Sequence, residues 1–345
     1  MTTNHQPVES DGILLDAAAP LLEPRSLNRR LPPIVAGGVD ALLATVGAIE
    51  DFRTTMEVVS KWLEIDRMGG HNIRIARSVA DIRTAKASGK TAIVIHFQGA
   101  DPIEDELDFL NAFRDCGLRA MQLTYNSRNR LGDGAFEPTD AGLSKFGKKV
   151  VKRMEELSIA VDLAHAGNRT TLDAAAAASR PIIVSHANAR ALCDTPRNLT
   201  DEAIRAVAAS GGVIGICAFP YFIKRTGTPD LEGLVDHADY ISRLVGPQHV
   251  GLGFDFADED EDDYVYYGYD DRYIPHPPWT WPAGISGHAD ARNVAGSLRA
   301  RGFSATETRG ILGENFLRVF SEAEMVARKM SRTISGGGST KRINR

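Results

Sequence analysis

The sequence predicts an α/β fold in which eight strands alternate with helices and close into a (β/α)8 TIM barrel. Short apolar runs bounded by glycine, proline or polar residues recur along the chain, as parallel strands buried on both faces do. Segments with helical periodicity separate these runs. No Gly-x-Gly-x-x-Gly pattern opens a helix after the first run, and eight repeats in 345 residues suit a closed barrel better than an open doubly wound sheet.

The clearest repeat covers residues 159–198. Two apolar runs, 159–164 and 181–185, are each followed by a histidine, His165 and His186, and the Ala-rich segment 170–179 between them is long enough to be a crossover helix. The carboxyl ends of barrel strands gather at one mouth, so the two imidazoles can meet there. The alternative is that each histidine caps its strand and hydrogen-bonds to a neighbouring loop.

The other elements follow from the same patterns. Further strands are expected at 12–16, 39–46, 91–99, 120–126, 213–219 and 249–256. Helices are expected at 54–65, 78–88, from 102 onward, 146–157, from 201 to 210 and at 231–244, with Ser78 and Thr200 as N-caps. Helices in 286–320 complete the last repeat. We therefore expect a flexible tail at 1–11, a single barrel domain at 12–325 and a disordered Gly-rich tail at 326–345.

Composition narrows the class of partner. With 43% hydrophobic and 25% charged residues the chain can bury a large core, and a net charge of −5 argues against a nucleic-acid surface. The three cysteines are odd in number and far apart, so neither a disulfide framework nor a Cys-x-x-Cys zinc site is indicated. The first twelve residues are polar and lack the basic-apolar-small pattern of a signal peptide, and no apolar run approaches the length of a membrane span. We expect a cytoplasmic protein that binds a small molecule rather than nucleic acid or membrane, and a homodimer is left open.

The strand ends supply a candidate active site. Gln98, Tyr125, His165, His186 and Asp255 are all expected at the mouth of the barrel. Two histidines and a carboxylate suit a divalent metal such as zinc, which lowers the pKa of bound water to about 7. Asp255 stands between two phenylalanines, so burial should perturb its pKa and suit it to catalysis as a general base or acid. Its alternative role is to cap the next helix.

Two further features lie in loops near this mouth. Arg197 can hold a substrate carboxylate with two parallel hydrogen bonds, or it can form a surface ion pair with Asp194 or Asp201. The acidic run 258–263 is typical of a solvated loop. Because tyrosines follow it at 264, 266, 267 and 269, the run can also be part of a lid over the mouth.

Seven segments, in this order along the chain, resemble the renal or membrane dipeptidase family, metallopeptidases built on an amidohydrolase-like barrel. They are IED at 103–105, QLTYN at 122–126, GLSKFG at 142–147, VDLAH at 161–165, SHANAR at 185–190 with PRN at 196–198, GGVIG at 211–215 and ILGENFLRVF at 311–320. The resemblance implies that His165 and His186 bind one of two zinc ions, that Arg197 holds the substrate carboxylate and that Asp255 handles the proton.

The chain departs from the family pattern at the other zinc ion. Ala18 and Pro20 stand where the family has a His-x-Asp motif, Gln98 replaces the glutamate that bridges the two ions, and Tyr125 replaces a histidine near the substrate. A neutral glutamine cannot bridge two dications or offset their charge. His96 lies one pleat deeper than Gln98 and is a weak substitute ligand.

The resulting functional hypothesis is a dipeptidase-like metallohydrolase. It would use one divalent metal, zinc, bound by His165, His186 and either Gln98 or Asp255, and cleave an amide or peptide bond in a small carboxylate-bearing substrate. Two alternatives remain open. One is a relative that performs a different metal-assisted step on a non-peptide metabolite, and the other is a metal-free pseudoenzyme that binds such a metabolite through Arg197.

Overall fold

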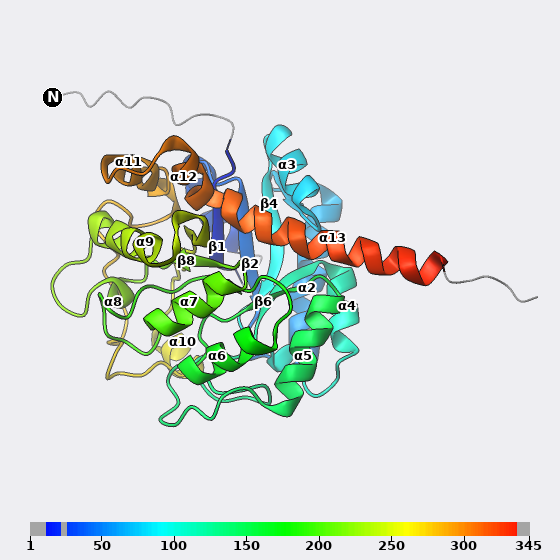
Figure 1. The fold of residues 1–345 in the computed structure, drawn as a ribbon. Helices are drawn as coiled ribbons and strands as arrows, with labels where there is room; N and C mark the ends of the chain where they lie inside the picture. Colours follow the sequence, from blue (N-terminus) through cyan, green and yellow to red (C-terminus); the bar gives the residue numbers. More distant parts are fainter. Residues whose placement is uncertain (1–11, 22–25, 337–345) are drawn as a thin grey trace, which may run out of the picture.

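The barrel is confirmed in a computed structural model, which describes the backbone of residues 12–21 and 26–336 and side chains up to residue 325 (Figure 1). All strand pairings in its sheet are parallel, in the order β1-β2-β4-β5-β6-β7-β8-β9, with β3 paired to the first half of β4. The strands are β1 (Leu15–Pro20), β2 (Ala41–Gly47), β3 (Ile73–Ile75), β4 (Thr91–Phe97), β5 (Leu118–Gln122), β6 (Ala160–Asp162), β7 (Ile183–Val184), β8 (Val213–Ile216) and β9 (Val250–Leu252).

A polar side chain helps to close the barrel between β1 and β9. The amide of Asp255 donates to the carbonyl of Ala18 at 2.9 Å, and the amide of Phe254 donates to the carboxylate of Asp16 at 2.8 Å. The other Asp16 oxygen lies 2.8 Å from Nε2 of His288, a residue far along the chain. Asp16 is fully buried, so this carboxylate joins the first strand, the last strand and the segment that follows it.

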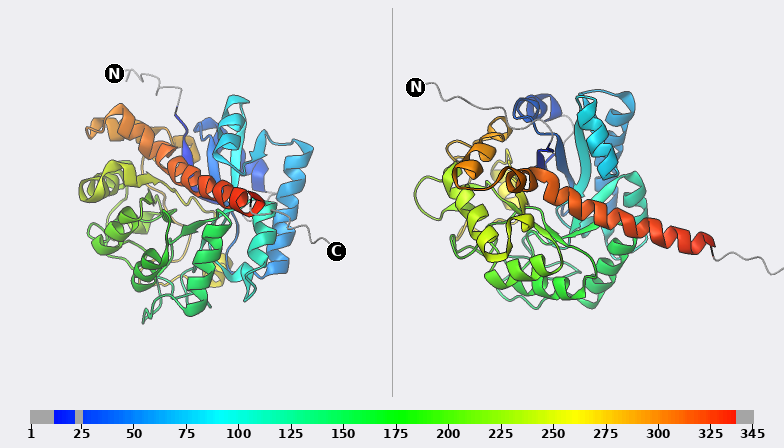
Figure 2. Two further views of the ribbon diagram at one scale, coloured as in Figure 1. Left: turned by 45° about the vertical axis from the view of Figure 1, so that its right-hand side comes forward. Right: turned by 45° about the horizontal axis from the view of Figure 1, so that its top comes forward.

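Helices surround the sheet (Figures 1 and 2). They are α1 (Leu27–Ala36), α2 (Phe52–Met68), α3 (Val79–Ala87), α4 (Phe109–Cys116), α5 (Lys145–Glu156), α6 (Asn168–Ala177), α7 (Asp201–Ala209), α8 (Pro220–Ile223), α9 (Leu231–Val245), α10 (Glu261–Tyr266), α11 (Asn293–Ala300), α12 (Ala305–Arg309) and α13 (Asn315–Gly336), with short turns η2 (Asp101–Ile103), η3 (Pro247–His249), η4 (His288–Asp290) and η5 (Gly310–Glu314). Among the described residues, none of these helices has the length and apolar character needed to cross a bilayer.

Helix α13 covers the end of the barrel opposite the mouth. Phe316 packs among small side chains at the amino ends of the strands, including Ala41 and Ala160. Gly251 makes room for it, because a Cβ atom at that position would lie 2.3 Å from the Phe316 ring. The helix then runs outward beyond the body of the protein (Figure 2). It continues to Gly336, so the domain boundary predicted at 325 falls inside a helix. The predicted tail at 1–11 and residues 337–345 lie outside the described residues.

Helix starts were predicted correctly at the two positions where a hydroxyl side chain caps the first turn. Ser78 accepts a hydrogen bond from the amide of Asp81, and Thr200 accepts one from the amide of Ala203, so both predicted N-caps are confirmed. The helix predicted from Pro102 is wrong at its start. Glu104 has φ = 52°, which interrupts the short η2 turn, and α4 begins only at Phe109. The three-residue strand β3 was not predicted because it is too short to show a pattern.

Candidate active site

Two histidines from neighbouring strands meet at the mouth of the barrel. His165 follows β6, His186 follows β7, and their Nε2 atoms lie 2.8 Å apart. Both side chains are buried. Burial lowers the pKa of each imidazole well below its ordinary value, and the positive charge of Arg197 acts in the same direction. Both rings are therefore neutral near pH 7 and can act as metal ligands or proton acceptors.

The hydrogen bonds on the far side of each ring decide which nitrogen carries its proton. Nδ1 of His165 lies 2.8 Å from Oδ1 of Asn126, which only accepts, so Nδ1–H donates and Nε2 keeps its lone pair. Nδ1 of His186 lies 2.8 Å from the hydroxyl of Ser185, which can accept or donate. If the hydroxyl accepts, two Nε2 lone pairs face each other and need a cation or a proton between them. If it donates, His186 Nε2–H donates to His165.

Asp255 and Gln98 stand beside this pair. One Asp255 oxygen lies 3.7 Å from Nε2 of His186, and the other accepts a 3.5 Å hydrogen bond from the Gln98 amide. Burial raises the pKa of Asp255 to about 6, although Arg197 and the Gln98 hydrogen bond oppose the shift. Asp255 does not cap the next helix, because Asp260 caps α10. The alternative helix-capping role is therefore wrong.

Arg197 is buried at the same mouth without a matching anion. Its side chain is only 3% exposed, Nε and Nη2 have no hydrogen-bond partner among the described residues, and its guanidinium lies 5.0 Å from the centre of the Phe222 ring. Asp194 pairs with Arg190 instead, and Asp201 accepts from Tyr240. The alternative of a surface ion pair is wrong. A buried guanidinium with free donors is suited to hold a ligand carboxylate.

Tyr125 connects the histidine pair to the segment above it. Its ring stacks on His165 with 4.1 Å between ring centroids, and its hydroxyl lies 3.3 Å from that of Tyr269. The Tyr267 ring is 5.5 Å from Tyr125, and the Tyr267 carbonyl accepts a hydrogen bond from Asn126. Residues 258–269, which we call the lid, therefore cover the mouth. The run 258–263 is a solvated loop only in part: Asp258 pairs with Arg29 and Arg30 at its start, and Glu259 turns inward.

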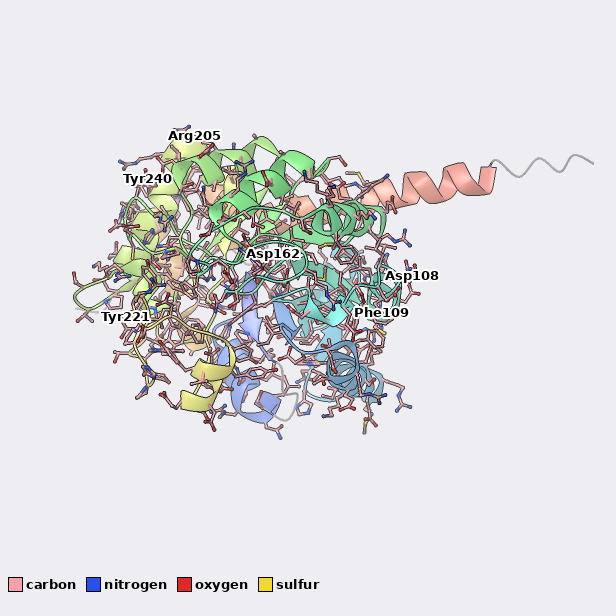
Figure 3. All side chains as sticks on the ribbon, turned by 90° about the horizontal axis from the view of Figure 1, so that it is seen from below. Asp108, Phe109, Asp162, Arg205, Tyr221 and Tyr240 are labelled. Atoms are coloured by element: carbon pink, nitrogen blue, oxygen red, sulfur yellow. The ribbon has the colours of Figure 1, made fainter. Side chains whose placement is uncertain are left out.

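Two residues of this constellation, Asn126 and Ser185, were given no role from the sequence, and Glu259 and Tyr269 were considered only as part of a possible lid. Asn126 and Ser185 are adjacent in sequence to residues that were given one, so their positions after a strand were available as a signal. The inward turn of the lid has no such signal. His96, by contrast, is fully buried and pairs with Asp162 at 2.9 Å; Asp162 is labelled near the middle of the molecule in Figure 3.

The mouth of the barrel offers two converging imidazoles as metal ligands, and the positions where the family has further ligands offer fewer donors. Ala18 and Pro20 offer no ligand atom, and Gln98 turns its amide nitrogen toward Asp255. Within 12–21 and 26–325, no group of three or more His, Cys, Asp or Glu side chains is arranged to hold a metal. The two converging imidazoles are suitable ligands for a single ion, because the Nδ1–H of His165 is already held by an oxygen as in metal-binding histidines.

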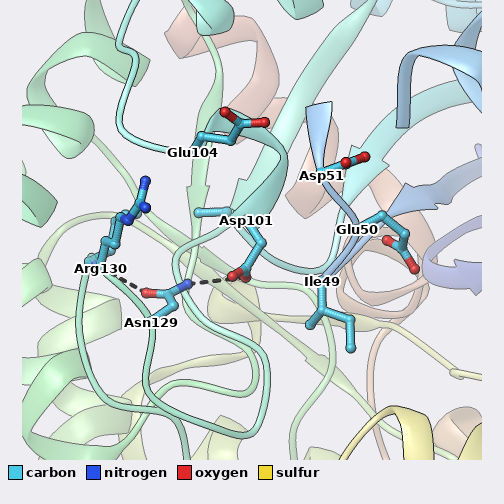
Figure 4. A pocket seen from close by; sticks show the side chains of 9 residues that line it. Ile49, Glu50, Asp51, Asp101, Glu104, Asn129 and Arg130 are labelled. Carbon is cyan, nitrogen blue, oxygen red and sulfur yellow. Dashed lines mark hydrogen bonds between the residues drawn. The ribbon is translucent and has the colours of Figure 1, made fainter. Parts of the chain in front are cut away.

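A separate acidic hollow lies at the rim, in the loops after β2, β4 and β5 (Figure 4). Its volume is about 460 Å³, and it is lined by Ile49, Glu50, Asp51, Ala100, Asp101, Glu104, Asn129, Arg130 and Leu131. Asn129 donates to Asp101 across it. None of its lining residues belongs to the cluster around the histidines, so the hollow and the candidate active site are distinct.

Comparison with known proteins identifies the family of the chain. Residues 25–271 match the family model described as membrane dipeptidase, peptidase family M19. An uncharacterised protein in the pqqA 5′ region of Klebsiella pneumoniae is 31% identical over 257 residues, covering 72% of this chain and 88% of that protein. Dipeptidase aclJ of Aspergillus oryzae is 28% identical over 265 residues, covering 75% of this chain. The match spans only 58% of aclJ, which is a longer protein.

Solved structures share the whole fold. An amidohydrolase from Pseudomonas aeruginosa superposes with a TM-score of 0.83 at 29% identity, covering 91% of this chain and 97% of that one. A metallopeptidase from Rhodobacter sphaeroides, solved with a phosphinate mimic of the dipeptide L-Ala-D-Ala, superposes with a TM-score of 0.76 at 22% identity, covering 91% and 100%. The family model, which matches well over half of the chain, shows that this protein belongs to the membrane dipeptidase family, peptidase family M19.

Proposed function

We propose that this protein is a hydrolase that cleaves the peptide or amide bond of a dipeptide-like substrate with a free carboxylate. The observation that carries the proposal is the arrangement at the mouth: two neutral imidazoles with converging Nε2 atoms, a carboxylate 3.7 Å from one of them, and a buried guanidinium with free donors. Membership of the dipeptidase family supports the reaction class.

One divalent metal, zinc, would be held by His165 and His186, with Gln98 as a third ligand if its amide oxygen turns inward. When bound, such an ion supplies Lewis acidity and lowers the pKa of a bound water. The Asn126 oxygen fixes the His165 tautomer that this binding needs. The Ser185 hydroxyl can do the same for His186 by accepting its Nδ1–H.

The remaining steps belong to the side chains. Arg197 holds the substrate carboxylate and fixes the scissile bond over the histidine pair. Asp255, whose pKa burial raises to about 6, is mostly ionised at pH 7 yet close enough to its pKa to accept a proton and return it to the leaving amine. Tyr125 and the lid exclude bulk water, and substrate entry requires the lid to open, because His165 and His186 are buried beneath it.

Elemental analysis and a substrate screen test this proposal. Purified protein is expected to contain no more than one tightly bound divalent ion per chain and to hydrolyse dipeptides or N-acyl amino acids. His165→Ala and His186→Ala should each lose the ion and the activity while keeping the fold by circular dichroism, whereas His276→Ala, at an exposed site, should change neither.

Three outcomes would contradict parts of this proposal. Two ions per chain would overturn the single-metal assignment, and full occupancy in either histidine variant would overturn the ligands. Absence of both metal and hydrolysis would favour the metal-free binding protein. The cytoplasmic location and the homodimer that the sequence leaves open stay predictions, which fractionation of cells and sedimentation analysis can check.

A further inference from the structure

The lid brings one carboxylate of its acidic run to the mouth of the barrel. Asp258 pairs with arginines of α1, Asp260 caps α10, and Asp262 points to solvent. Glu259 differs from them: its Oε2 atom is buried and has no hydrogen-bond partner among the described residues. Its carboxylate is hydrogen-bonded to the hydroxyl of Tyr269.

Tyr269 places this carboxylate beside the candidate active site. The Tyr269 hydroxyl lies 3.3 Å from that of Tyr125, and the Tyr125 ring stacks on His165. Asp255 also faces Glu259 closely enough to raise its pKa. Glu259 is therefore linked to His165 through two tyrosines at the covered mouth of the barrel.

Two buried polar groups thus lie near the histidine pair without a partner. Arg197 has free donors, Glu259 has a free acceptor, and no ion pair joins them in the described structure. Asp255 and Tyr269 act electrostatically on both groups, so both lie close to these two residues. A buried donor or acceptor without a hydrogen-bond partner is unfavourable. A ligand that carries both a cation and an anion would remove both penalties at once.

We propose that Glu259, together with the Tyr269 hydroxyl, binds the free amino group of the substrate, so that the site selects zwitterionic peptides over N-acylated ones. The inference rests on the proposed function, in which Arg197 holds the carboxylate at the other end. Glu259 is a specificity-determining residue in this arrangement. It acts on substrate binding and takes no part in the proton transfers of hydrolysis.

Paired substrates test the assignment. Alanyl-alanine and N-acetyl-alanyl-alanine differ only in the charge and size of the amino end. Wild type should prefer the free amine, and Glu259→Gln should raise the KM for alanyl-alanine by at least about tenfold, the effect of losing a buried charge-assisted contact, with little change for the acetylated peptide. Asp262→Asn removes the same charge from an exposed position of the lid and should behave as wild type.

A proton count provides a second readout. Burial is the main cause that raises the pKa of Glu259 to about 8; Asp255 and Asp263 add to the shift, while the Tyr269 hydrogen bond and Arg30 oppose it. The ligand-free carboxyl is thus largely protonated at pH 7, and binding an ammonium group should release that proton. Calorimetry in buffers of different ionisation enthalpy should detect proton release in wild type and its loss in Glu259→Gln, which a purely structural glutamate would not produce.

The ketomethylene isostere of alanyl-alanine separates the two proposals, because it has both charges and no bond to hydrolyse. If neither peptide is cleaved but the isostere binds in a Glu259-dependent way, the proposed function fails and the amino-group site stands. If peptides are cleaved and Glu259→Gln keeps the wild-type preference for the free amine, the amino-group site is refuted and the hydrolase stands.

Discussion

Three side chains at the candidate active site follow strands in a left-handed backbone conformation. Asn126, His165 and Asp255 have φ angles of 49°, 61° and 59°. Residues other than glycine adopt this region at a cost of about 1–3 kcal/mol each, and such positions cluster at functional sites. Here the sharp turn at each strand end aims the side chain back over the mouth of the barrel. At the residue scale, the backbone stores strain where the side chains of the candidate active site converge.

Arg197 gives the sharpest prediction at this scale. If it holds the substrate carboxylate, Arg197→Ala should weaken binding by about 2–5 kcal/mol, part of which is the cost of leaving the ligand carboxylate unpaired. Arg197→Lys should fall closer to Arg197→Ala than to wild type, since an ammonium group lacks the planar fork. Arg190→Ala, which removes a partly exposed arginine of the same loop, serves as the matched control.

The measurement is KM for a dipeptide and for its carboxyl-amidated form. Amidation should impair wild type and leave Arg197→Ala nearly indifferent. Equal sensitivity of both proteins to amidation would show that Arg197 only orders its loop.

Some residues of the candidate active site could be placed from the sequence, and others could not. His165, His186, Gln98 and Asp255 could be placed together because each follows a strand, and strand ends share one mouth. Glu259 could not, because its neighbours are set by the path of the lid through tyrosine contacts that no local pattern encodes. The burial of Arg197 could not be predicted either, since it depends on the Phe222 ring from another loop.

At the scale of elements, one buried histidine, His237, connects helix α9 to the loop after β7 and to helix α8. Nδ1 of His237 accepts from the amide of Ala189 at 3.2 Å, and Nε2 lies 3.2 Å from the carbonyl of Ile223, to which it donates. This arrangement requires the neutral ring. Burial lowers the pKa of His237 to about 4, although the Ile223 carbonyl opposes the shift. The loop after β7 and helix α8 are thus both attached to α9 through a neutral imidazole.

The pH dependence of stability follows from that shift. Because the folded pKa lies below that of the unfolded chain, the unfolded state binds the proton first, and stability present above about pH 6.5 is lost as pH falls toward 4. The shift corresponds to roughly 3 kcal/mol of unfolding free energy. Urea unfolding at pH 7 and pH 5 should show a smaller loss for His237→Gln than for wild type. An equal loss would assign the pH dependence to other groups.

Helix starts that are marked by a capping side chain could be predicted from the sequence. The ends of elements that depend on contacts with distant residues could not. Ser78 and Thr200 identify helix starts because their hydroxyls satisfy free amides. The acids after Pro102 look like a helix start as well, yet the chain turns at Glu104. Strand β1 runs on to Pro20 although a proline favours an earlier end; the Ala18 carbonyl there accepts from Asp255, a partner more than two hundred residues away.

At the scale of the whole molecule, the barrel depends on how its first and last strands meet. The sequence predicts the number of repeats, since each is a local pattern, but not the means of closure. Asp16 accepts from the amides of Ala18 and Phe254 and pairs with His288, and it is fully buried. This one carboxylate satisfies three donors on three segments. The closure also positions Asp255, the residue after Phe254, at the active-site mouth.

Replacing this carboxylate should therefore affect both stability and the site. Asp16→Ala leaves two buried amides and His288 without an acceptor, and each buried donor left without a partner costs about 1–3 kcal/mol. Asp16→Asn keeps one oxygen for the Phe254 amide and should lose clearly less. Urea unfolding measures both free energies, and hydrogen exchange at the Phe254 amide should accelerate in Asp16→Ala before other strands open. If the two variants are equally stable, or if exchange at Phe254 does not change, the seam between β1 and β9 is held by backbone contacts and apolar packing instead.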